Sequence, residues 1–181
     1  MNKGTVELAT LKAGEVFKIA EHDFIVLEQM DGAAAVISKD LMAEREAFGE
    51  SKDYNTSNIK ALIERDIQPV IEAAVGVENL VEYEVDLTSV DMQNEYGTCR
   101  CKVRPITFDE ARKYNDLLVN KELPGWWWTC TPWSTKERGW KWSMVVVSPS
   151  GDFSFSSYDD YCRGVRPFCI LKSNIFVSKG E

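Results

Sequence analysis

The chain has 181 residues, of which 44% are hydrophobic and 28% are charged, enough apolar sequence for one domain with its own core. Six tryptophans and an aromatic content of 11% exclude a disordered chain. No apolar stretch approaches the roughly 20 residues that a membrane-spanning helix needs. The net charge of −8 disfavours nucleic-acid binding, which depends on basic groups that neutralise phosphates.

Charge is distributed unevenly along the chain. Residues 44–86 contain eleven acids and four bases, whereas residues 99–142 contain nine bases and five acids. A solvated helix face is the ordinary explanation of such an acidic half. The alternative is an acidic surface that meets a basic partner.

The cysteines and the single histidine give little support to metal or redox chemistry. Five cysteines are an odd number, and no secretory signal is visible in residues 1–13, so we expect free thiols in a cytoplasmic protein or a virion component. Cys99 and Cys101 are too close in sequence for a zinc knuckle, and His22 is the only histidine. The sequence therefore predicts no metal and no cofactor.

The first half of the chain reads as strands followed by a helix. Residues 14–40 contain three short apolar runs, with Asp31-Gly32 as a favoured hairpin turn, and predict a three-stranded meander. Apolar positions at helical spacing predict a helix over residues 56–74. Pro69 should interrupt it, with a kink or two short helices meeting near Asp66.

The second half reads as a helix followed by strands. Thr107 and Glu110 have the spacing of a capping box and predict a helix over residues 107–120. Residues 125–177 predict an aromatic-rich sheet, with strands at 126–130, 140–148, 153–156 and 164–171. The predicted order is strands, a helix, a strand pair, a second helix and further strands. Because helices and strands do not alternate regularly, this order predicts an α+β fold.

Motifs that carry common enzyme chemistry are missing from the sequence. It has no glycine-rich phosphate loop, no serine elbow and no paired histidines. Asp159 and Asp160 alone supply too few oxygens for a calcium site. We therefore expect a protein without catalytic activity.

Aromatic residues are the strongest local signal, since all six tryptophans lie between Trp126 and Trp142. Successive strand residues point to opposite faces, so the three consecutive tryptophans at 126–128 cannot all enter one core. Two or three of the six should fill the core. We expect Trp133, Trp140 and residues 158–161 to be exposed together as a ligand platform, because amphipathic rings bury much area at low entropic cost.

Two C-terminal motifs resemble a known group of proteins. Trp-Trp-Trp-Thr-Cys-Thr-Pro at 126–132 and Gly-Val-Arg-Pro-Phe-Cys-Ile-Leu at 164–171 are similar to motifs of an uncharacterised family common in prophages and gut Firmicutes. The resemblance extends from about residue 11 to residue 171. That family in turn resembles the C-type-lectin-like fold shared by formylglycine-generating enzymes and by the variable receptor-binding proteins of diversity-generating retroelements.

The resemblance implies one C-type-lectin-like domain over residues 1–181, with mixed or antiparallel sheets and two main helices. In the retroelement proteins, the displayed positions lie between the tryptophan strand and the Gly-x-Arg-Pro strand. The resemblance thus implies ligand-binding roles for Trp133, Lys136, Arg138, Trp140, Lys141, Phe155, Tyr158, Asp159, Asp160 and Tyr161. Trp127 and Arg166 are predicted to be structural, with the guanidinium of Arg166 satisfying buried carbonyls or an acid.

The chain departs from these families at three points. Cys130-Thr131 replaces the Arg-Ser of the prophage family motif. The calcium-binding motifs of true lectins are absent, so calcium-dependent sugar binding is not implied. The cysteine pair of the formylglycine-generating enzymes has no counterpart that we can assign.

These observations predict a non-enzymatic recognition protein, encoded by a phage or prophage, that presents an aromatic surface to a protein or glycan. No specific nucleic-acid partner and no membrane are expected. A first alternative is an acidic intracellular inhibitor or regulator of a host protein, such as a defence protein, that docks through residues 44–86. A second is an enzyme of the formylglycine-generating type that uses Cys130, Cys162 or Cys169.

Overall fold

The computed structural model describes residues 4–180 and has an α+β fold in which all strand ladders are antiparallel. A seven-stranded sheet has the order β1-β12-β2-β3-β4-β11-β7. Its strands are β1 (Thr5–Glu7), β2 (Val16–Ile19), β3 (His22–Met30), β4 (Ala33–Ser38), β7 (Val103–Pro105), β11 (Pro167–Lys172) and β12 (Phe176–Lys179). A smaller sheet contains β8 (Trp127–Pro132), β9 (Ser143–Val147) and β10 (Phe153–Ser157), and a two-stranded ribbon contains β5 (Tyr83–Asp86) and β6 (Thr98–Cys101).

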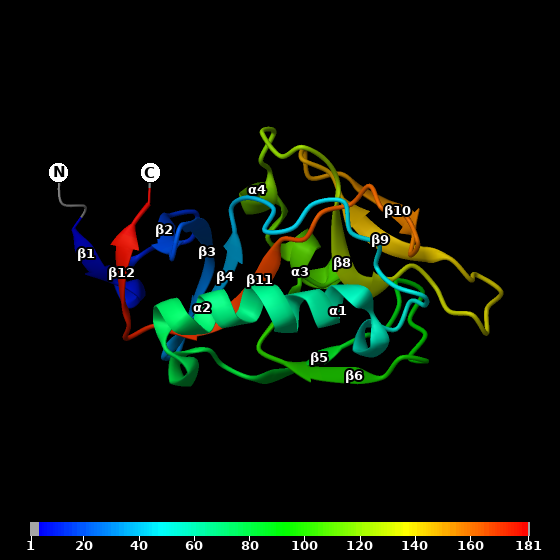
Figure 1. Cartoon of the computed structure of the whole chain (residues 1–181), viewed down its shortest axis with the longest axis horizontal. Helices are drawn as coiled ribbons and strands as arrows, with labels where there is room; N and C mark the ends of the chain where they lie inside the picture. The colour runs from blue at the N-terminus through cyan, green and yellow to red at the C-terminus, as the bar shows by residue number, and fades with distance from the viewer. Residues whose placement is uncertain (1–3, 181) are drawn as a thin grey trace.

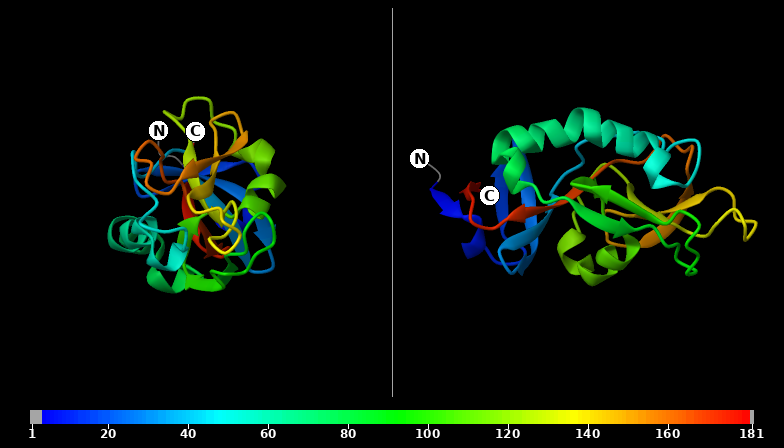
Figure 2. Two further views of the ribbon diagram at one scale, coloured as in Figure 1. Left: turned by 90° about the vertical axis from the view of Figure 1, so that its right-hand side faces the viewer. Right: turned by 90° about the horizontal axis from the view of Figure 1, so that it is seen from below.

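The central strands of the large sheet are buried on both faces. Along β3, Phe24 and Val26 enter one hydrophobic cluster, while Ile25 and Leu27 enter the other. This follows from the alternation of side chains along a strand. The right-hand view of Figure 2 shows helices on opposite sides of the strands. The predicted meander is confirmed as β2, β3 and β4, and Gly32 takes a positive φ of 70° at the β3–β4 turn.

The predicted helix over residues 56–74 is one helical run with a change of winding. It consists of α1 (Asn58–Leu62), a π-helical turn (Ile63–Ile67) and α2 (Gln68–Val75), after a short 3-10 turn (Tyr54–Thr56). The hydroxyl of Ser57 accepts a hydrogen bond from the amide of Lys60 at 3.0 Å and caps α1. Pro69 lies in the first turn of α2, where its missing N–H costs least. The interruption predicted near Asp66 is therefore the π-helical turn.

The second predicted helix is shorter and divided. It comprises α3 (Phe108–Lys113) and α4 (Asn115–Leu118), separated at Tyr114 by a non-helical backbone. The capping box is confirmed: the hydroxyl of Thr107 accepts from the amide of Glu110, and the carboxylate of Glu110 accepts from the amide of Thr107. Two further 3-10 turns lie at Leu8–Thr10 and Val77–Asn79.

The prediction of one aromatic-rich sheet over residues 125–177 is wrong. Only β8, β9 and β10 form the small sheet, whereas β11 lies between β4 and β7, and β12 lies between β1 and β2. The strand predicted at 140–148 begins at Ser143, because a hydrogen bond of 2.9 Å from the amide of Trp133 to the carbonyl of Ser143 closes the preceding segment into a loop. Trp140 and Trp142 consequently lie on this loop and not on a strand.

Both described ends of the chain lie at one end of the elongated molecule, and the β8–β9 loop projects from the other (Figure 1). No helix within residues 4–180 is long and apolar enough to cross a membrane.

Candidate recognition surface

Two of the three consecutive tryptophans are interior residues. Trp127 and Trp128 are both 0% exposed and enter different hydrophobic clusters, because neighbouring strand residues face opposite ways. The indole N–H of Trp128 donates to the carbonyl of Glu46 at 2.7 Å, and its ring meets Phe48 edge-on at 5.6 Å. Trp126 is half-buried at the edge of the core.

Arg166 joins three elements from within the core. Its guanidinium donates to the carbonyl of Ser38 at 3.0 Å and to the carbonyl of Leu118 at 2.8 Å, and lies 4.9 Å from the ring of Trp127. Burial lowers its pKa to about 10, still above neutrality, so the group is a buried cation. These contacts hold the last residues of β4 and α4 against Arg166, which directly precedes β11.

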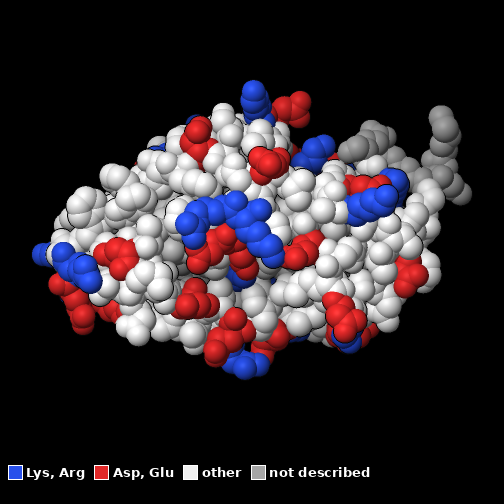
Figure 3. All heavy atoms as spheres, turned by 180° about the vertical axis from the view of Figure 1, so that it is seen from behind, with Lys and Arg blue, Asp and Glu red and all other residues white. Residues whose placement is uncertain are grey.

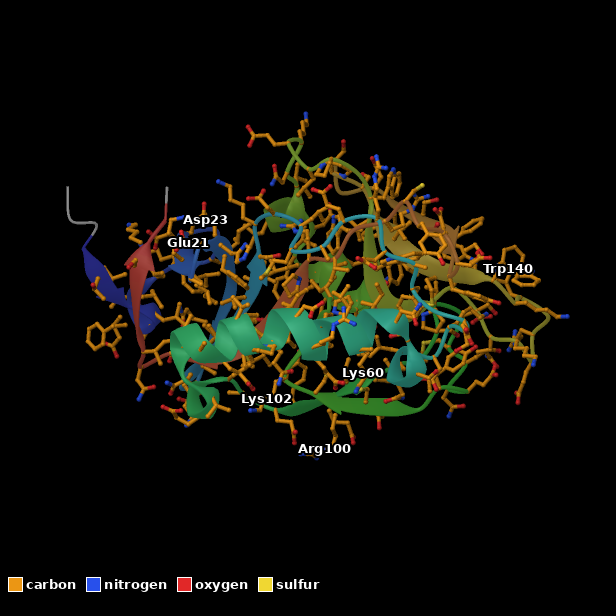
Figure 4. The ribbon with its side chains drawn as sticks, viewed as in Figure 1. Glu21, Asp23, Lys60, Arg100, Lys102 and Trp140 are labelled. Atoms are coloured by element: carbon orange, nitrogen blue, oxygen red, sulfur yellow. The ribbon has the colours of Figure 1, made fainter. Side chains whose placement is uncertain are left out.

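Beyond the core, large aromatic side chains are exposed around the small sheet. Trp140 is 44% exposed, Trp142 57%, Phe155 47% and Tyr161 70%. Figure 4 places Trp140 near the end of the molecule that is remote from both termini. A fold is normally stabilised by burying such rings. A group of exposed aromatic side chains at one end of the molecule is therefore typical of an interaction site.

The exposed rings contact one another in two groups. Phe155 on β10 lies 5.1 Å from the half-buried Trp133 and 6.0 Å from Trp140, measured between ring centroids. Trp142 lies 6.0 Å from Tyr158, whose amide donates to the carbonyl of Trp142 at 2.8 Å. Tyr158 was expected to be exposed but is half-buried, because its ring packs against the core. We call these five residues the aromatic surface. Tyr161 follows on the same β10–β11 loop, and no ring contact is recorded for it among the described residues.

A buried lysine holds the loop that carries the aromatic surface. Lys52 is 2% exposed, and its ammonium donates to the carbonyl of Ser134 at 2.6 Å and to the carbonyl of Trp140. Burial lowers the pKa of Lys52, and the charges of Glu95 and Asp91 oppose that change. One cation thus binds both sides of the loop, which limits the conformations open to its tryptophans.

Two acids add further anchors to this loop. The carboxylate of Asp91 accepts from the hydroxyl of Ser134 at 2.6 Å, and that of Glu95 accepts from the amide of Lys136 at 3.1 Å. The side chains of Lys136, Arg138 and Lys141 are exposed, so the loop presents positive charge between its rings.

The two aspartates predicted to bind ligand have local partners. Asp160 accepts from the hydroxyl of Ser156 at 2.8 Å and from the amide of Cys162 at 2.9 Å, and pairs with Arg163 at 3.0 Å. Partial burial opposes ionisation, but these bonds and the arginine hold the pKa of Asp160 below its ordinary value. Asp159 is exposed and accepts from the hydroxyl of Ser157. Asp160 therefore shapes the β10–β11 loop, while Asp159 remains at its surface.

Sequence reasoning missed Trp142 and Lys52. Trp142 carried the same aromatic signal as Trp140, but both were placed on a strand beside Met144, which is fully buried. Nothing in the sequence separates Lys52 from surface lysines, because its role depends on carbonyls more than 80 positions away.

The cysteines proposed for catalysis differ in their surroundings. Cys130 and Cys169 are buried, and burial raises the pKa of each thiol to about 12. Cys162 is exposed. Cys99 and Cys101 are buried neighbours on β6, and a hydrogen bond from Cys101 lowers the pKa of Cys99 to about 7. Within residues 4–180, no group of three or more His, Cys, Asp or Glu is placed to hold a metal ion.

The acidic segment at residues 44–86 does not form one uncompensated patch. Four of its acids are ion-paired, and their basic partners come both from within the segment and from the β6 region. The pairs are Glu64–Lys60, Asp66–Arg65, Glu72–Lys102 and Glu82–Arg100. The charges of the remaining acids are spread over several elements.

Comparison with known proteins gives no relative from which a role could be transferred, since no family model, curated protein or solved structure matches the chain.

Proposed function

We propose that the protein is a non-enzymatic recognition module that binds a protein or glycan partner through the aromatic surface. The observation that carries the proposal is the exposure of Trp140 and Trp142, on a loop whose backbone is held from inside the core by Lys52, and of Phe155 on the neighbouring strand β10. Exposed rings on an unanchored loop would lose conformational entropy on binding. Rings that are already oriented lose less, so more of the contact energy appears as affinity.

The composition of the surface also suits recognition. Indole and phenol rings combine apolar area with a hydrogen-bonding edge, and Lys136, Arg138 and Lys141 add exposed positive charge next to them. A partner that offers a flat apolar patch or the apolar face of a sugar, with nearby acidic or hydroxyl groups, would complement it.

We further propose that the fold is C-type-lectin-like and that the chain is related to the prophage family and to the retroelement receptor-binding proteins. The antiparallel sheets, the helices on opposite sides and the irregular aromatic segments between β8 and β11 support this assignment. A phage or prophage origin would accord with a module that recognises molecules of a host.

A catalytic role has less support. Cys130 and Cys169 are protonated at neutral pH because burial raises the pKa of each to about 12. The alternative of an inhibitor that docks through residues 44–86 is weakened by the ion pairs that already neutralise Glu64, Glu72 and Glu82.

The test is a binding screen with matched variants. Wild-type protein is probed on a printed panel of bacterial and mammalian glycans and against a phage-displayed random-peptide library. We expect ligands whose binding falls at least about tenfold in the variant Trp140→Ala/Trp142→Ala/Phe155→Ala, because hot-spot aromatic residues each contribute about 2 kcal/mol or more. Its melting temperature should change little, since the rings are exposed.

Phe176→Ala provides the control, because Phe176 is 72% exposed on β12 near the opposite end of the molecule. It should retain full binding. Ligands that bind the triple variant as tightly as the wild type, or a screen that yields no ligand, would refute the proposal.

A further inference from the structure

A concave site lies away from the aromatic surface, along the outer edge of β5. It is a pocket of about 490 Å³, within the range of volumes that hold small ligands. All four residues of β5 line it, and no described residue of β6 does. Facing residues come from β7, from α3 and its N-terminus, from β8 and β11, and from the segment after β5. They include Met92, Arg104, Phe108, Glu110 and Ile170.

The backbone of β5 is paired on one side only, because β5 and β6 form a sheet by themselves. The amide of Leu87 donates to the carbonyl of Gly97 at 2.9 Å, and the register then continues as Val85 opposite Cys99. In an antiparallel ladder every second residue exchanges hydrogen bonds with the partner strand. The N–H and C=O groups of Glu84 and Asp86 therefore point away from β6, toward the pocket.

The two edges of the β5–β6 ribbon have different neighbours. On the β6 edge, the carbonyl of Thr98 accepts a hydrogen bond from the side chain of Asn55 at 3.2 Å, next to α1. In the right-hand view of Figure 2, the ribbon lies between the α1–α2 side and the α3 side. The β5 edge borders the pocket instead, and an open strand edge is a template for another strand.

Charge in the pocket is not balanced. Arg104 forms a two-pronged ion pair with Glu110, at 2.6 and 2.7 Å, and Arg112 pairs with Asp109. Glu84 and Asp86 then remain as acids without an ion pair among the described residues. Figure 3 shows acidic and basic side chains intermingled over the middle of the face that it draws, with uncharged surface between them. The uncompensated charge of the pocket itself is negative.

The lining also contains unused hydrogen-bonding groups. Arg104 is 1% exposed and lies between the rings of Tyr83 and Phe168, with its Cζ 5.0 and 4.6 Å from their centroids. Its Nε and the hydroxyl of Tyr83 have no hydrogen-bond partner among the described residues. Apolar contact is offered beside them by Phe108, Ile170 and the 79% exposed Met92.

We propose that this pocket binds an extended peptide segment of a partner protein, which adds as a strand to the free edge of β5. Along β5, Tyr83 and Val85 face inward, while Glu84 and Asp86 are exposed. A strand paired with β5 would place alternate side chains beside Glu84 and Asp86 and the others over Phe108 and Ile170. The segment is therefore one in which lysine or arginine alternates with apolar residues.

The binding test uses a fluorescently labelled peptide, acetyl-Val-Lys-Val-Lys-Val-amide, and its charge-reversed counterpart with glutamate in place of lysine. Fluorescence anisotropy at low salt should give saturable binding of the lysine peptide with a dissociation constant below about 1 mM. The glutamate peptide should bind at least about tenfold more weakly, because like charges would face each other across the strands. Equal binding of both peptides, or no saturable binding of the lysine peptide, would overturn the proposal.

Variants of β5 separate the contribution of side-chain charge to peptide affinity from the contribution of backbone hydrogen bonds. Glu84→Gln/Asp86→Asn should weaken lysine-peptide binding by about tenfold, whereas Glu78→Gln, an exposed acid outside the pocket, should leave it within about twofold. Glu84→Pro removes an N–H that does not serve β6, and proline is tolerated at such an edge position. It should weaken binding by a further tenfold or so relative to Glu84→Gln.

Two further measurements do not depend on whether the β5 variants fold correctly. A peptide N-methylated at its central residues should lose binding to unmodified protein if backbone pairing is the mode. Trp142→Ala should not change the affinity, because Trp142 lies outside the pocket. Undiminished binding of the N-methylated peptide would contradict strand addition.

Discussion

Trp128 and Trp142 are the same residue type only 14 positions apart, yet one is fully buried and the other is 57% exposed. Trp128 lies on β8, where its pairing with Val146 of β9 directs its ring into the core. Trp142 lies on a loop whose backbone is held by hydrogen bonds, so its ring remains at the surface without destabilising the segment. The difference teaches that backbone pairing decided the role of each ring, and residue type did not.

The largest expected effect separates these two tryptophans. Trp128→Ala should lower the free energy of unfolding by about 3–5 kcal/mol, because it leaves a cavity beside Phe48 and removes the hydrogen bond to Glu46. Trp142→Ala should cost less than about 1 kcal/mol, mainly its ring contact with Tyr158. Urea unfolding of both variants measures the two values. Similar losses in the two variants would show that the aromatic surface is part of the core.

A second, intermediate effect is expected at the lysine that links the two regions. Lys52→Met should cost about 2–3 kcal/mol, because the carbonyls of Ser134 and Trp140 lose a buried charged donor. Amide hydrogen exchange in residues 134–142 should accelerate at the same time. The control is Lys60→Met, which removes only an i,i+4 pair with Glu64 and should cost about 0.5 kcal/mol or less. An unchanged exchange rate in the loop would show that Lys52 does not hold it.

The smallest expected effect is the dependence of stability on acid pH through Glu110, which pairs with the buried Arg104. Burial opposes ionisation of Glu110, but the hydrogen bonds and charge of Arg104, together with Thr107, hold its pKa below the ordinary value of 4.5. A carboxyl with a depressed folded-state pKa stabilises the fold above its unfolded-state pKa and loses that contribution as the pH falls through the folded-state pKa. The free energy of unfolding should therefore decrease on acidification below pH 4.5.

Glu110→Gln provides the matched measurement for this pH dependence. The variant should show a flatter profile of unfolding free energy between pH 5 and about pH 2, because it lacks the titrating group. Trp142→Ala should keep the wild-type profile, since the aromatic surface contributes nothing to the Arg104–Glu110 pair. Parallel profiles for wild type and Glu110→Gln would assign the acid sensitivity to other carboxyls.

Local signals in the sequence predicted the local elements well. The Asp31-Gly32 turn between alternating apolar runs gave the meander, and the spacing of Thr107 and Glu110 gave the capping box. Both rest on interactions within a few residues, which a sequence pattern contains in full. The α+β class followed from the order of such elements.

Sequence patterns did not predict which distant strands pair with one another. The strand at 167–172 is apolar from Pro167 to Leu171, which fits burial on both faces but does not say between which strands it lies. The start of β9 was misplaced because the loop before it is set by Trp133, Ser143 and Lys52, which come from three separate segments. The pocket beside β5 was not anticipated either, because the order of elements predicts a strand pair between the two helices but not which edge of that pair stays open.

By itself, the sequence determined the class of the fold, its turns and caps, and the presence of more aromatic residues than one core requires. Only the tertiary structure decided which rings are exposed, which lysine is buried beneath them and which strand edge remains open. The physical reason is that turns and caps depend on neighbours in the chain, whereas exposure depends on contacts between segments that lie far apart in sequence and meet only after folding.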